Sequence, residues 1–172
     1  NDVSLERISL LRDNYERLGV LNMSITMYDG RRFPLACQFD KVLVDAPCSC
    51  EGVIRKDYGA LKNLSPGLYW HMHRLQRALL LRAVKLVRPG GIVIYSTCTF
   101  APEENELVVD YVLKRVEGLE LEPVEIRGLR HYPGLIEWEG RELHPDLAYC
   151  ARFYPHVNDT GGLFVAKIRR IS

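Results

Sequence analysis

Two short apolar runs, each ending in a polar turn that carries a cysteine, constrain the fold of this chain more than any other feature. The first is Val-Leu-Val-Asp-Ala-Pro-Cys at residues 42–48, and the second is Ile-Val-Ile-Tyr-Ser-Thr-Cys at residues 92–98. Such runs are typical of strands that are buried on both faces of a parallel sheet. Ligands of open parallel sheets bind at the carboxyl ends of the strands. We therefore expect Cys48 and Cys98 to meet at one site.

Helical and strand-like patterns alternate along the rest of the chain. Apolar residues at steps of three or four predict helices over residues 4–18, 67–87 and 103–116. Ser4 is the expected N-cap of the first helix, Gly19 lies just beyond its end, and residues 51–66 form a long loop. Strands are expected over residues 24–28, 41–45, 91–96, 119–126, 148–154 and 162–169. This order predicts an α/β fold with a doubly wound, mostly parallel sheet that an antiparallel pair closes at one edge.

The composition fits a single domain covering residues 1–172. Hydrophobic residues make up 47% of the chain, enough for a core, and the formal net charge of +1 favours no particular partner. The 5 cysteines, an odd number, and the lack of a signal peptide indicate a reducing, cytoplasmic location with free thiols. No apolar run approaches the ~18 residues that a membrane span needs. The chain opens at Asn1 within what reads as a strand–helix unit, so we expect an N-terminally truncated domain.

The residues around the two cysteines predict chemistry as well as structure. Asp45 ends the first apolar run, and Pro47 fixes the chain as it turns, which directs the carboxylate and the Cys48 sulfur toward the same place. Cys98 lies shortly before a predicted helix, whose N-terminus favours the nucleophilic thiolate. The alternative is a pair of buried structural cysteines, because free cysteine is often buried. The acidic residues of the first helical turn are expected to stabilise the helix rather than to catalyse: Glu103, Glu104 and Glu106.

Two further acidic residues, Asp2 and Asp29, each follow an expected strand end. In nucleotide-binding sheets, such an acid accepts hydrogen bonds from ribose hydroxyls, and another accepts from an exocyclic amine. Aspartate at a strand end also caps turns and helices, so a purely structural role stays open for both residues.

These stretches together resemble the RNA 5-methylcytosine methyltransferase family, the Sun-type enzymes that use S-adenosyl-L-methionine. The similarity runs in family order over nearly the whole chain, through residues 2–19, 29–34, 45–52, 88–106 and 152–166. Its most specific parts are Asp-Ala-Pro-Cys and the combination of Tyr-Ser-Thr-Cys with Pro-Glu-Glu-Asn-Glu. The resemblance implies a class I methyltransferase with a Rossmann-like fold. This chain then corresponds to the C-terminal part of the catalytic domain, without the first strand or strands.

The resemblance also implies residue roles. Cys98 corresponds to the nucleophile, Cys48 to the cysteine that assists product release, and Asp45 to the acid that contacts the target base. The positions that correspond to cofactor contacts are Asp2, Arg7, Asp29, Asp45 and Pro47. The chemistry agrees, because a thiolate that adds to cytosine C6 makes C5 nucleophilic enough to accept a methyl group, and a second group must then remove the C5 proton. The target base has to leave its stack to reach these groups.

Two departures from the family pattern affect these expectations. The family usually has a glycine near position 50, whereas this chain has Cys50 followed by Glu51, which adds a third thiol near the site. The glycine-rich cofactor loop that follows the first strand is absent, so we expect this stretch alone to bind the cofactor poorly.

RNA is the expected partner, with tRNA weakly favoured over rRNA. Arg55 and Lys56 supply positive charge in the long loop, and His156 lies between the last two strands, where the resemblance continues. These three residues are the expected substrate contacts, and a structural role stays open for His156. A catalytically silent RNA-binding module on the same fold is the main alternative, although such a module has no need of both cysteines. DNA cytosine methylation is another alternative, in which Cys48 is the nucleophile.

A zinc site is the remaining alternative, with Cys48, Cys50, His71 and His73 as ligands. The two histidines lie about 200° apart around the expected helix, so one ion cannot easily use both. The chain also has no Cys-x-x-Cys pair, and we therefore expect no metal.

Overall fold

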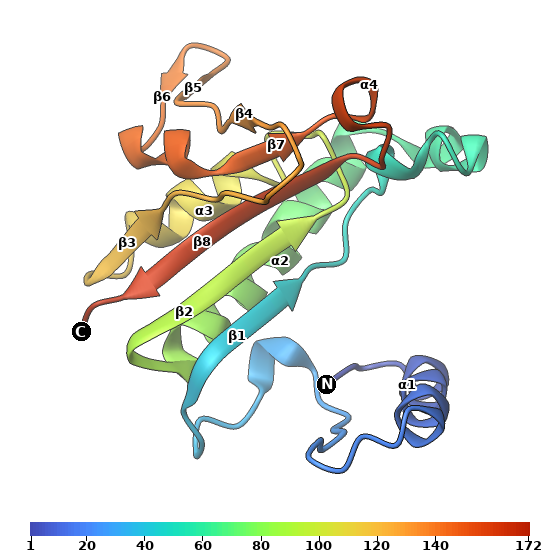
Figure 1. Ribbon diagram of the computed structural model, residues 1–172. Helices are drawn as coiled ribbons and strands as arrows, with labels where there is room; N and C mark the ends of the chain where they lie inside the picture. The colour runs from blue at the N-terminus through green and yellow to red at the C-terminus, as the bar shows by residue number, and fades with distance from the viewer. The chain divides into compact units, whose positions relative to one another are not determined.

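The computed structural model describes residues 1–172, apart from the side chains of Ala60 and Asn63. The chain divides into two compact units, residues 1–36 and 37–172 (Figure 1). The α-helices are α1 (Leu5–Arg17), α2 (Pro66–Leu86), α3 (Glu106–Leu113) and α4 (Pro155–Asn158). The strands are β1 (Phe39–Asp45), β2 (Val87–Thr97), β3 (Leu119–Glu122), β4 (Tyr132–Pro133), β5 (Glu137–Trp138), β6 (Arg141–Glu142), β7 (Ala151–Phe153) and β8 (Leu163–Arg170). Short 3-10 helices cover Gly30–Arg32, Glu51–Val53, Tyr58–Asn63 and Pro145–Tyr149.

The first unit contains α1, whose predicted ends are confirmed. The Ser4 hydroxyl accepts a hydrogen bond from the Arg7 amide at 3.4 Å, so Ser4 is the N-cap. Gly19 follows the helix with a φ of 64°, in the left-handed region that favours glycine at the end of a helix. These two residues therefore set the length of α1 as the sequence indicates.

The strand predicted over residues 24–28 does not form. This segment is irregular, and the Asn1 side chain takes the hydrogen bonds that a neighbouring strand would supply. The Asn1 amide group donates to the Tyr28 carbonyl and accepts from the Tyr28 amide, both at 3.0 Å. The Asn1 side chain satisfies the backbone hydrogen bonds of one residue but cannot form the repeated bonds of a β-ladder. In the described chain, the segment therefore has no neighbouring strand to pair with, despite its β-forming residues.

The sheet of the second unit is mixed, and the prediction that it is mostly parallel is wrong for the described chain. The strand order is β1-β2-β8-β7-β4, and β3 pairs with β8 beside β7. In this sheet β1 and β2 run parallel, whereas β8 runs antiparallel to β2, β3 and β7. The last two strands are an antiparallel pair as predicted, but β8 lies inside the sheet and not at its edge. A short connection from β7 to β8 favours this antiparallel arrangement.

The core lies between the sheet and the helices α2 and α3, which cover one face of it (Figure 1). Fully buried side chains from all these elements meet there: Leu80, Val84, Val93, Tyr95, Val108, Val112, Phe164 and Ile168. The helix α2 matches its predicted range closely, whereas α3 starts later than predicted because residues 102–105 form a turn. None of the described helices is long and apolar enough to cross a membrane.

Strand β1 is half-exposed in the second unit and not buried on both faces as predicted. Val42 and Val44 pack against the core, while Leu43 is 68% exposed on the opposite face. Helix α2 packs against β1, and Val42 and Val44 contact the core that contains it; β1 is also the end strand of the described sheet, paired with β2 alone. What the sequence predicted correctly is that the two strands run parallel; in the observed register Asp45 lies opposite Ser96.

Candidate functional site

The two conspicuous cysteines meet at the carboxyl ends of β1 and β2. The Ala46 amide donates to the Ser96 carbonyl at 3.0 Å, which extends the parallel pairing just past the end of β1. The segments that follow β1 and β2 both turn at this point, and the Cys48 and Cys98 sulfur atoms lie 3.2 Å apart. The prediction that these residues meet is confirmed. Cys50 joins them at 3.9 Å from the Cys48 sulfur, and we refer to these three residues as the thiol cluster.

The hydrogen bond within the thiol cluster makes its two main members unequal. The Cys48 thiol lowers the pKa of Cys98 by hydrogen bonding to it, and this effect outweighs the opposing effect of burial. The same hydrogen bond, together with burial, raises the pKa of Cys48. Cys98 is therefore the member that most readily becomes a thiolate. The cause differs from the predicted helix N-terminus, because α3 begins only at Glu106.

Cys50 occupies a backbone conformation that favours glycine. Its φ is 62°, in the left-handed region, close to where the family that the sequence resembles usually has a glycine. Its thiol lies 3.3 Å from the Cys48 carbonyl and hydrogen bonds to it, while burial raises its pKa. The departure in sequence therefore places a third thiol in the site without opening the turn.

The zinc set with two histidines is not assembled. The His73 Nδ1 atom is 2.6 Å from the Glu103 carbonyl and is engaged there, and His71 is exposed on α2. Within the described residues, the groups close enough to share a metal ion are the three sulfur atoms, which all lie within 4.8 Å of one another. That no metal is bound stays a prediction.

Glu104 supports the turn that carries Cys48. Its side chain is fully buried, and its Oε2 atom accepts hydrogen bonds from the Ser49 amide at 3.0 Å and from the Gln76 side chain at 2.8 Å. The same Gln76 nitrogen donates to the Pro47 carbonyl at 2.8 Å. Burial raises the pKa of Glu104. Glu104 lies ahead of α3 and holds residues 47–49, so the prediction that it stabilises the first helical turn is wrong.

Glu51 and Gly52 fasten the next part of the same loop to the segment after Cys98. One Glu51 oxygen accepts from the Thr99 hydroxyl and from the Phe100 amide, both at 3.0 Å. The Gly52 amide donates to the Cys98 carbonyl at 2.7 Å. A side chain at position 52 would place its Cβ 2.4 Å from the Gly162 carbonyl oxygen, so only glycine allows this close approach.

A buried ion pair lies behind these loops. Arg152 donates to both Glu106 oxygens, at 2.6 and 2.5 Å, and both side chains are almost fully buried. Arg152 also donates to the Phe100 carbonyl at 3.0 Å and to the Tyr154 hydroxyl at 3.3 Å. Sequence reasoning gave no role to Gln76, and it included Arg152 only as the start of the matching stretch 152–166. A buried polar residue gives no periodic signal that would have shown its role.

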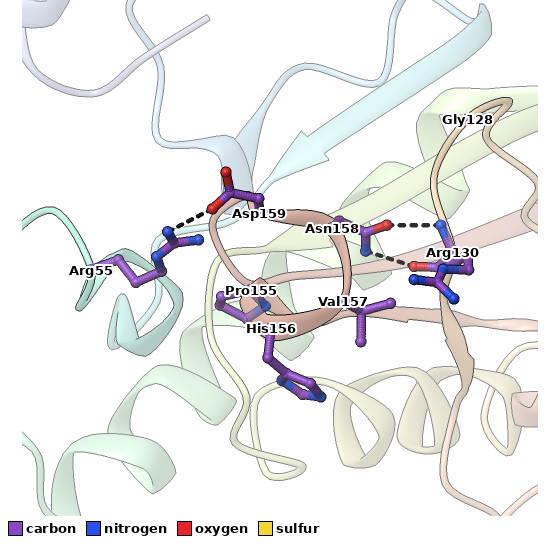
Figure 2. Close-up of a pocket in the computed structure, with 8 residues that line it drawn as sticks. All are labelled: Arg55, Gly128, Arg130, Pro155, His156, Val157, Asn158 and Asp159. Carbon is purple, nitrogen blue, oxygen red and sulfur yellow. Dashed lines mark hydrogen bonds and ion pairs between the residues drawn. The ribbon is translucent and has the colours of Figure 1, made fainter.

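The remaining predicted residues of the second unit are spread around this core of contacts. Asp45 ends β1 with an exposed side chain, and among the described residues no hydrogen bond links its carboxylate to a thiol. Pro47 takes part through its carbonyl group alone. Arg55 pairs with Asp159 at 2.6 Å. Arg55 and His156 line one cavity, as Figure 2 shows, whereas Lys56 is exposed and is not among the residues that line it.

The predicted cofactor contacts Asp2, Arg7 and Asp29 belong to the first unit. The Asp2 carboxylate accepts from the Arg7 guanidinium at 3.1 Å. Asp29 pairs with Arg31 at 2.6 Å, and that hydrogen bond lowers the pKa of Asp29 to about 2. About 30% of each aspartate side chain is exposed. Both carboxylates are therefore hydrogen-bond acceptors that are partly open to further donors, such as ribose hydroxyls or an adenine amine.

The chain is similar to several groups of known proteins. The family model described as 16S rRNA methyltransferase RsmB/F matches residues 1–169. A tRNA (cytosine(49)-C(5))-methyltransferase of Pyrococcus abyssi is 41% identical over 99% of this chain and 54% of the relative. The 25S rRNA (cytosine-C(5))-methyltransferase nop2 of Schizosaccharomyces pombe is 39% identical over 100% of this chain and 29% of the relative. The chain thus spans about half the length of these relatives, or less.

Solved structures match the fold as well as the sequence. A methyltransferase homologue from Pyrococcus horikoshii has a TM-score of 0.83 and 35% identity, over 98% of this chain and 52% of the other. The structure of NSun6 from the same species, described as solved with SFG, has a TM-score of 0.81 and 34% identity, over 99% of this chain and 40% of the other. Both similarities extend through the two units of this chain.

Proposed function

The chain belongs to the 16S rRNA methyltransferase RsmB/F family, and we propose on this basis that it forms the thiol-bearing part of an enzyme that methylates C5 of cytosine in RNA. It has the α/β class I methyltransferase fold of its solved relatives. The single observation that carries the proposal is the 3.2 Å contact between the Cys48 and Cys98 sulfur atoms, one of which has a lowered pKa and the other a raised one. The reaction needs two groups with these opposite properties.

Cys98 is the proposed nucleophile. Its lowered pKa favours the thiolate, which is the form that adds to C6 of cytosine. The addition forms a bond between sulfur and C6, and the electron density moves to C5, which makes C5 nucleophilic enough to accept a methyl group. Asp45 is the proposed contact to the base, where a carboxylic acid proton at N3 would stabilise the adduct.

Cys48 is arranged to act second. The pKa of its thiol is raised by the hydrogen bond with Cys98, by burial, and by the charge on Cys98. When Cys98 is bonded to C6, its sulfur is a neutral thioether, and the first and third of these causes are gone. We expect the pKa of Cys48 to fall at that stage, so that its thiolate can take the C5 proton. The C5 electron pair then restores the double bond and Cys98 leaves.

S-adenosyl-L-methionine is the proposed cofactor, and the resemblance to the family implies its contacts: Asp2, Arg7, Asp29, Asp45 and Pro47. The partly exposed carboxylates of Asp2 and Asp29 fit the hydroxyl and amine donors of an adenosine. When bound, the cofactor supplies a methyl group on a positively charged sulfur.

RNA is the proposed substrate class, with Arg55, Lys56 and His156 as contacts. The relatives carry names of tRNA enzymes and of rRNA enzymes at almost the same identity, 41% and 39%, so similarity does not separate these substrates. The preference for tRNA stays a prediction from the sequence. Proteins that act on a flipped base generally hold the RNA with positively charged and aromatic side chains near that base.

Trapping of the covalent adduct tests this mechanism. Full-length protein, Cys98→Ala and Cys48→Ala are incubated with labelled RNA and S-adenosyl-L-methionine, and the products are separated on a denaturing gel. We expect Cys98→Ala to form no adduct and no methylated RNA. Cys48→Ala should accumulate an adduct, because addition and methyl transfer proceed while release stalls. The matched control is Cys37→Ala, which removes an exposed thiol outside the cluster and should behave as wild type.

Two outcomes would contradict the assignment. An adduct that persists in Cys98→Ala and vanishes in Cys48→Ala would reverse the two roles and favour the DNA-type mechanism. Neither adduct nor methyl transfer in the wild-type protein would favour a silent RNA-binding module.

A further inference from the structure

Two cavities lie beside the loops that carry the thiol cluster. The larger has a volume of about 780 Å³ and the smaller about 320 Å³, and they share Arg55, Pro155 and His156 in their walls. Glu51 and Gly52, which directly follow Cys50, line the smaller one, as does Phe100, two residues after Cys98. The wall of the smaller cavity therefore contains residues that directly follow both cysteine-bearing turns.

Three aromatic rings form a continuous stack along this surface. Phe100 and Tyr154 have ring centroids 5.6 Å apart with 25° between their planes, and Tyr154 and His156 are also 5.6 Å apart, with 28° between theirs. We refer to Phe100, Tyr154 and His156 as the aromatic stack. Tyr154 is half-buried, and His156 is exposed at the outer end. The stack therefore presents a ring face at its end, against which another flat ring can lie.

The inner two rings of the aromatic stack, Phe100 and Tyr154, are held from behind. Arg152 donates to the Phe100 carbonyl and to the Tyr154 hydroxyl, and its own position is fixed by the buried ion pair with Glu106. Gly162 allows the Phe100 ring to approach the backbone, because a Cβ there would lie 2.2 Å from a ring carbon. A stacking surface that is fixed in advance loses little entropy when a ligand binds.

Positive charge flanks the stack. Arg55 lines both cavities and pairs with Asp159, whose side chain is 89% exposed. Arg130 lines the larger cavity, and its backbone is fixed by two hydrogen bonds with the Asn158 side chain, at 2.8 and 2.7 Å (Figure 2). An exposed ion pair such as Arg55–Asp159 holds its partners weakly, so the guanidinium can turn to a phosphate. Rings for stacking and arginines for the backbone are the combination that binds single-stranded nucleic acid.

We propose that the aromatic stack and its flanking arginines form a binding subsite for the nucleotide next to the target cytosine, with its base on His156 and its phosphates near Arg55 and Arg130. This inference rests on the proposed function, since it assumes that RNA is the substrate. It adds a way to hold the strand open: a neighbouring base that stacks on protein compensates for the stacking lost when the target base turns out. The subsite recognises a flat ring and a charge, so it tolerates any base.

Binding of synthetic RNA to full-length protein tests the subsite without catalysis. The probes are fluorescein-labelled single strands of about 15 nucleotides with one cytosine among uridines, and two copies that lack the base on the 5′ or on the 3′ side of the cytosine. We expect His156→Ala to weaken binding of the intact probe by about fivefold to a hundredfold, the range for one stacked base. His156→Phe should restore it. One of the two abasic probes lacks the base that stacks on His156. Wild type and His156→Ala should bind that probe with equal affinity.

Two further variants sharpen the test. His71→Ala removes an exposed histidine from α2 and should leave binding unchanged, which serves as the matched control. Arg130→Ala should make the salt dependence of binding shallower by about 0.7 in the logarithmic slope, as expected for one lost phosphate contact to a single strand. Melting temperatures of all variants confirm that they fold.

The subsite and the proposed function can fail separately. Suppose that wild type methylates RNA, but His156→Ala either weakens binding of the intact probe and of both abasic probes equally or leaves binding unchanged. The subsite is then wrong and the proposed function stands. If no methyl transfer occurs but the loss depends on the neighbouring base, the subsite stands and the function is wrong. Failure of wild type to bind the intact probe at low salt would overturn the subsite, because stacking and charge need no particular sequence.

Discussion

Glu104 and Glu106 are both fully buried and are separated by a single residue, yet their surroundings differ in the respect that matters most for a buried charge. Glu106 faces the Arg152 guanidinium through two short hydrogen bonds. Glu104 faces only neutral donors, from Ser49 and Gln76, and burial raises its pKa. The charge of Glu106 is therefore compensated by a cation, whereas the charge of Glu104 is stabilised only by neutral hydrogen-bond donors.

The difference shows how the site divides its work. Glu104 reaches back to the turn that carries Cys48, so it belongs to the region where bonds are made and broken. Glu106 reaches, through Arg152, to the aromatic stack, so it belongs to the region where we place RNA. The buried ion pair holds two side chains together, whereas the raised pKa of Glu104 makes its carboxylate easier to protonate. Substitutions at the two positions should therefore have different signatures.

Glu106→Gln should have the largest effect of all. It leaves the Arg152 charge buried without compensation, and breaking a buried pair in this way costs about 3–5 kcal/mol. Urea unfolding of the variant should show this loss in the free energy of unfolding. As a control, the double variant Glu106→Gln with Arg152→Met should lose less than the single one. Equal losses in both would mean that the ion pair matters for packing alone.

Glu104→Ala should come next, and its effect should fall on turnover. The Ser49 amide and the Gln76 side chain lose their acceptor, so the turn that carries Cys48 is free to shift. A shift of about 1 Å costs roughly a hundredfold in rate. Single-turnover methylation should slow by about tenfold to a hundredfold, while affinity for single-stranded RNA stays unchanged. A parallel fall in RNA affinity would show that the two regions are not separate.

Cys48→Ala should shift the reactivity of Cys98 to higher pH. The hydrogen bond from Cys48 is the largest cause of the lowered Cys98 pKa, so its removal raises that pKa. Alkylation of Cys98 by iodoacetamide at a series of pH values, followed by mass spectrometry of its peptide, measures the midpoint. Cys50→Gly is the control of opposite sign, because Cys50 raises the pKa of Cys98. If the alkylation midpoint of Cys98 shifts in the same direction in Cys48→Ala and in Cys50→Gly, the hydrogen bond from Cys48 is not the cause of the lowered pKa.

Glu104→Gln should have the smallest effect, visible in the pH dependence of stability. Because the folded pKa of Glu104 is raised, the folded state binds this proton more tightly than the unfolded state. The stability that Glu104 contributes is full below its ordinary pKa of about 4.3 and is lost as the pH rises through its raised folded value. Glutamine does not titrate, so the variant should gain on wild type across this window. Unfolding curves of both proteins from acid to neutral pH measure the difference, and a constant difference would contradict the raised pKa.

The sequence predicted those features that depend on local pattern. The ends of α1, the long helix α2 and the meeting of Cys48 with Cys98 all follow from periodicity, capping and the parallel pairing of two apolar runs. The position of β8 between β2 and β7 was not predictable in this way, because strand order depends on contacts between distant segments. A strand pattern shows that a segment is extended, but it does not show which strand is its neighbour.

The supporting residues of the site escaped prediction for a related reason. Gln76 and Arg152 look like ordinary polar residues of a helix and a strand, and only their partners far along the chain make them part of the site. Glu104 was assigned to a helix N-terminus because acids are common there, whereas its carboxylate turns toward Ser49. The left-handed backbone of Cys50 was not predicted, and the family's glycine near this position is the signal that could have indicated it.

The backbone contacts of Gly52 have a consequence for the order of folding. Gly52 donates to the Cys98 carbonyl and accepts from the Gly162 amide at 2.9 Å, so the loop after the thiols is complete only when three remote stretches have come together. Contacts between residues far apart in sequence form slowly, because the loop entropy must be overcome first. We expect the thiol cluster to be among the last features to reach its native geometry. During synthesis, these thiols would then remain accessible to solvent until the final strand is in place.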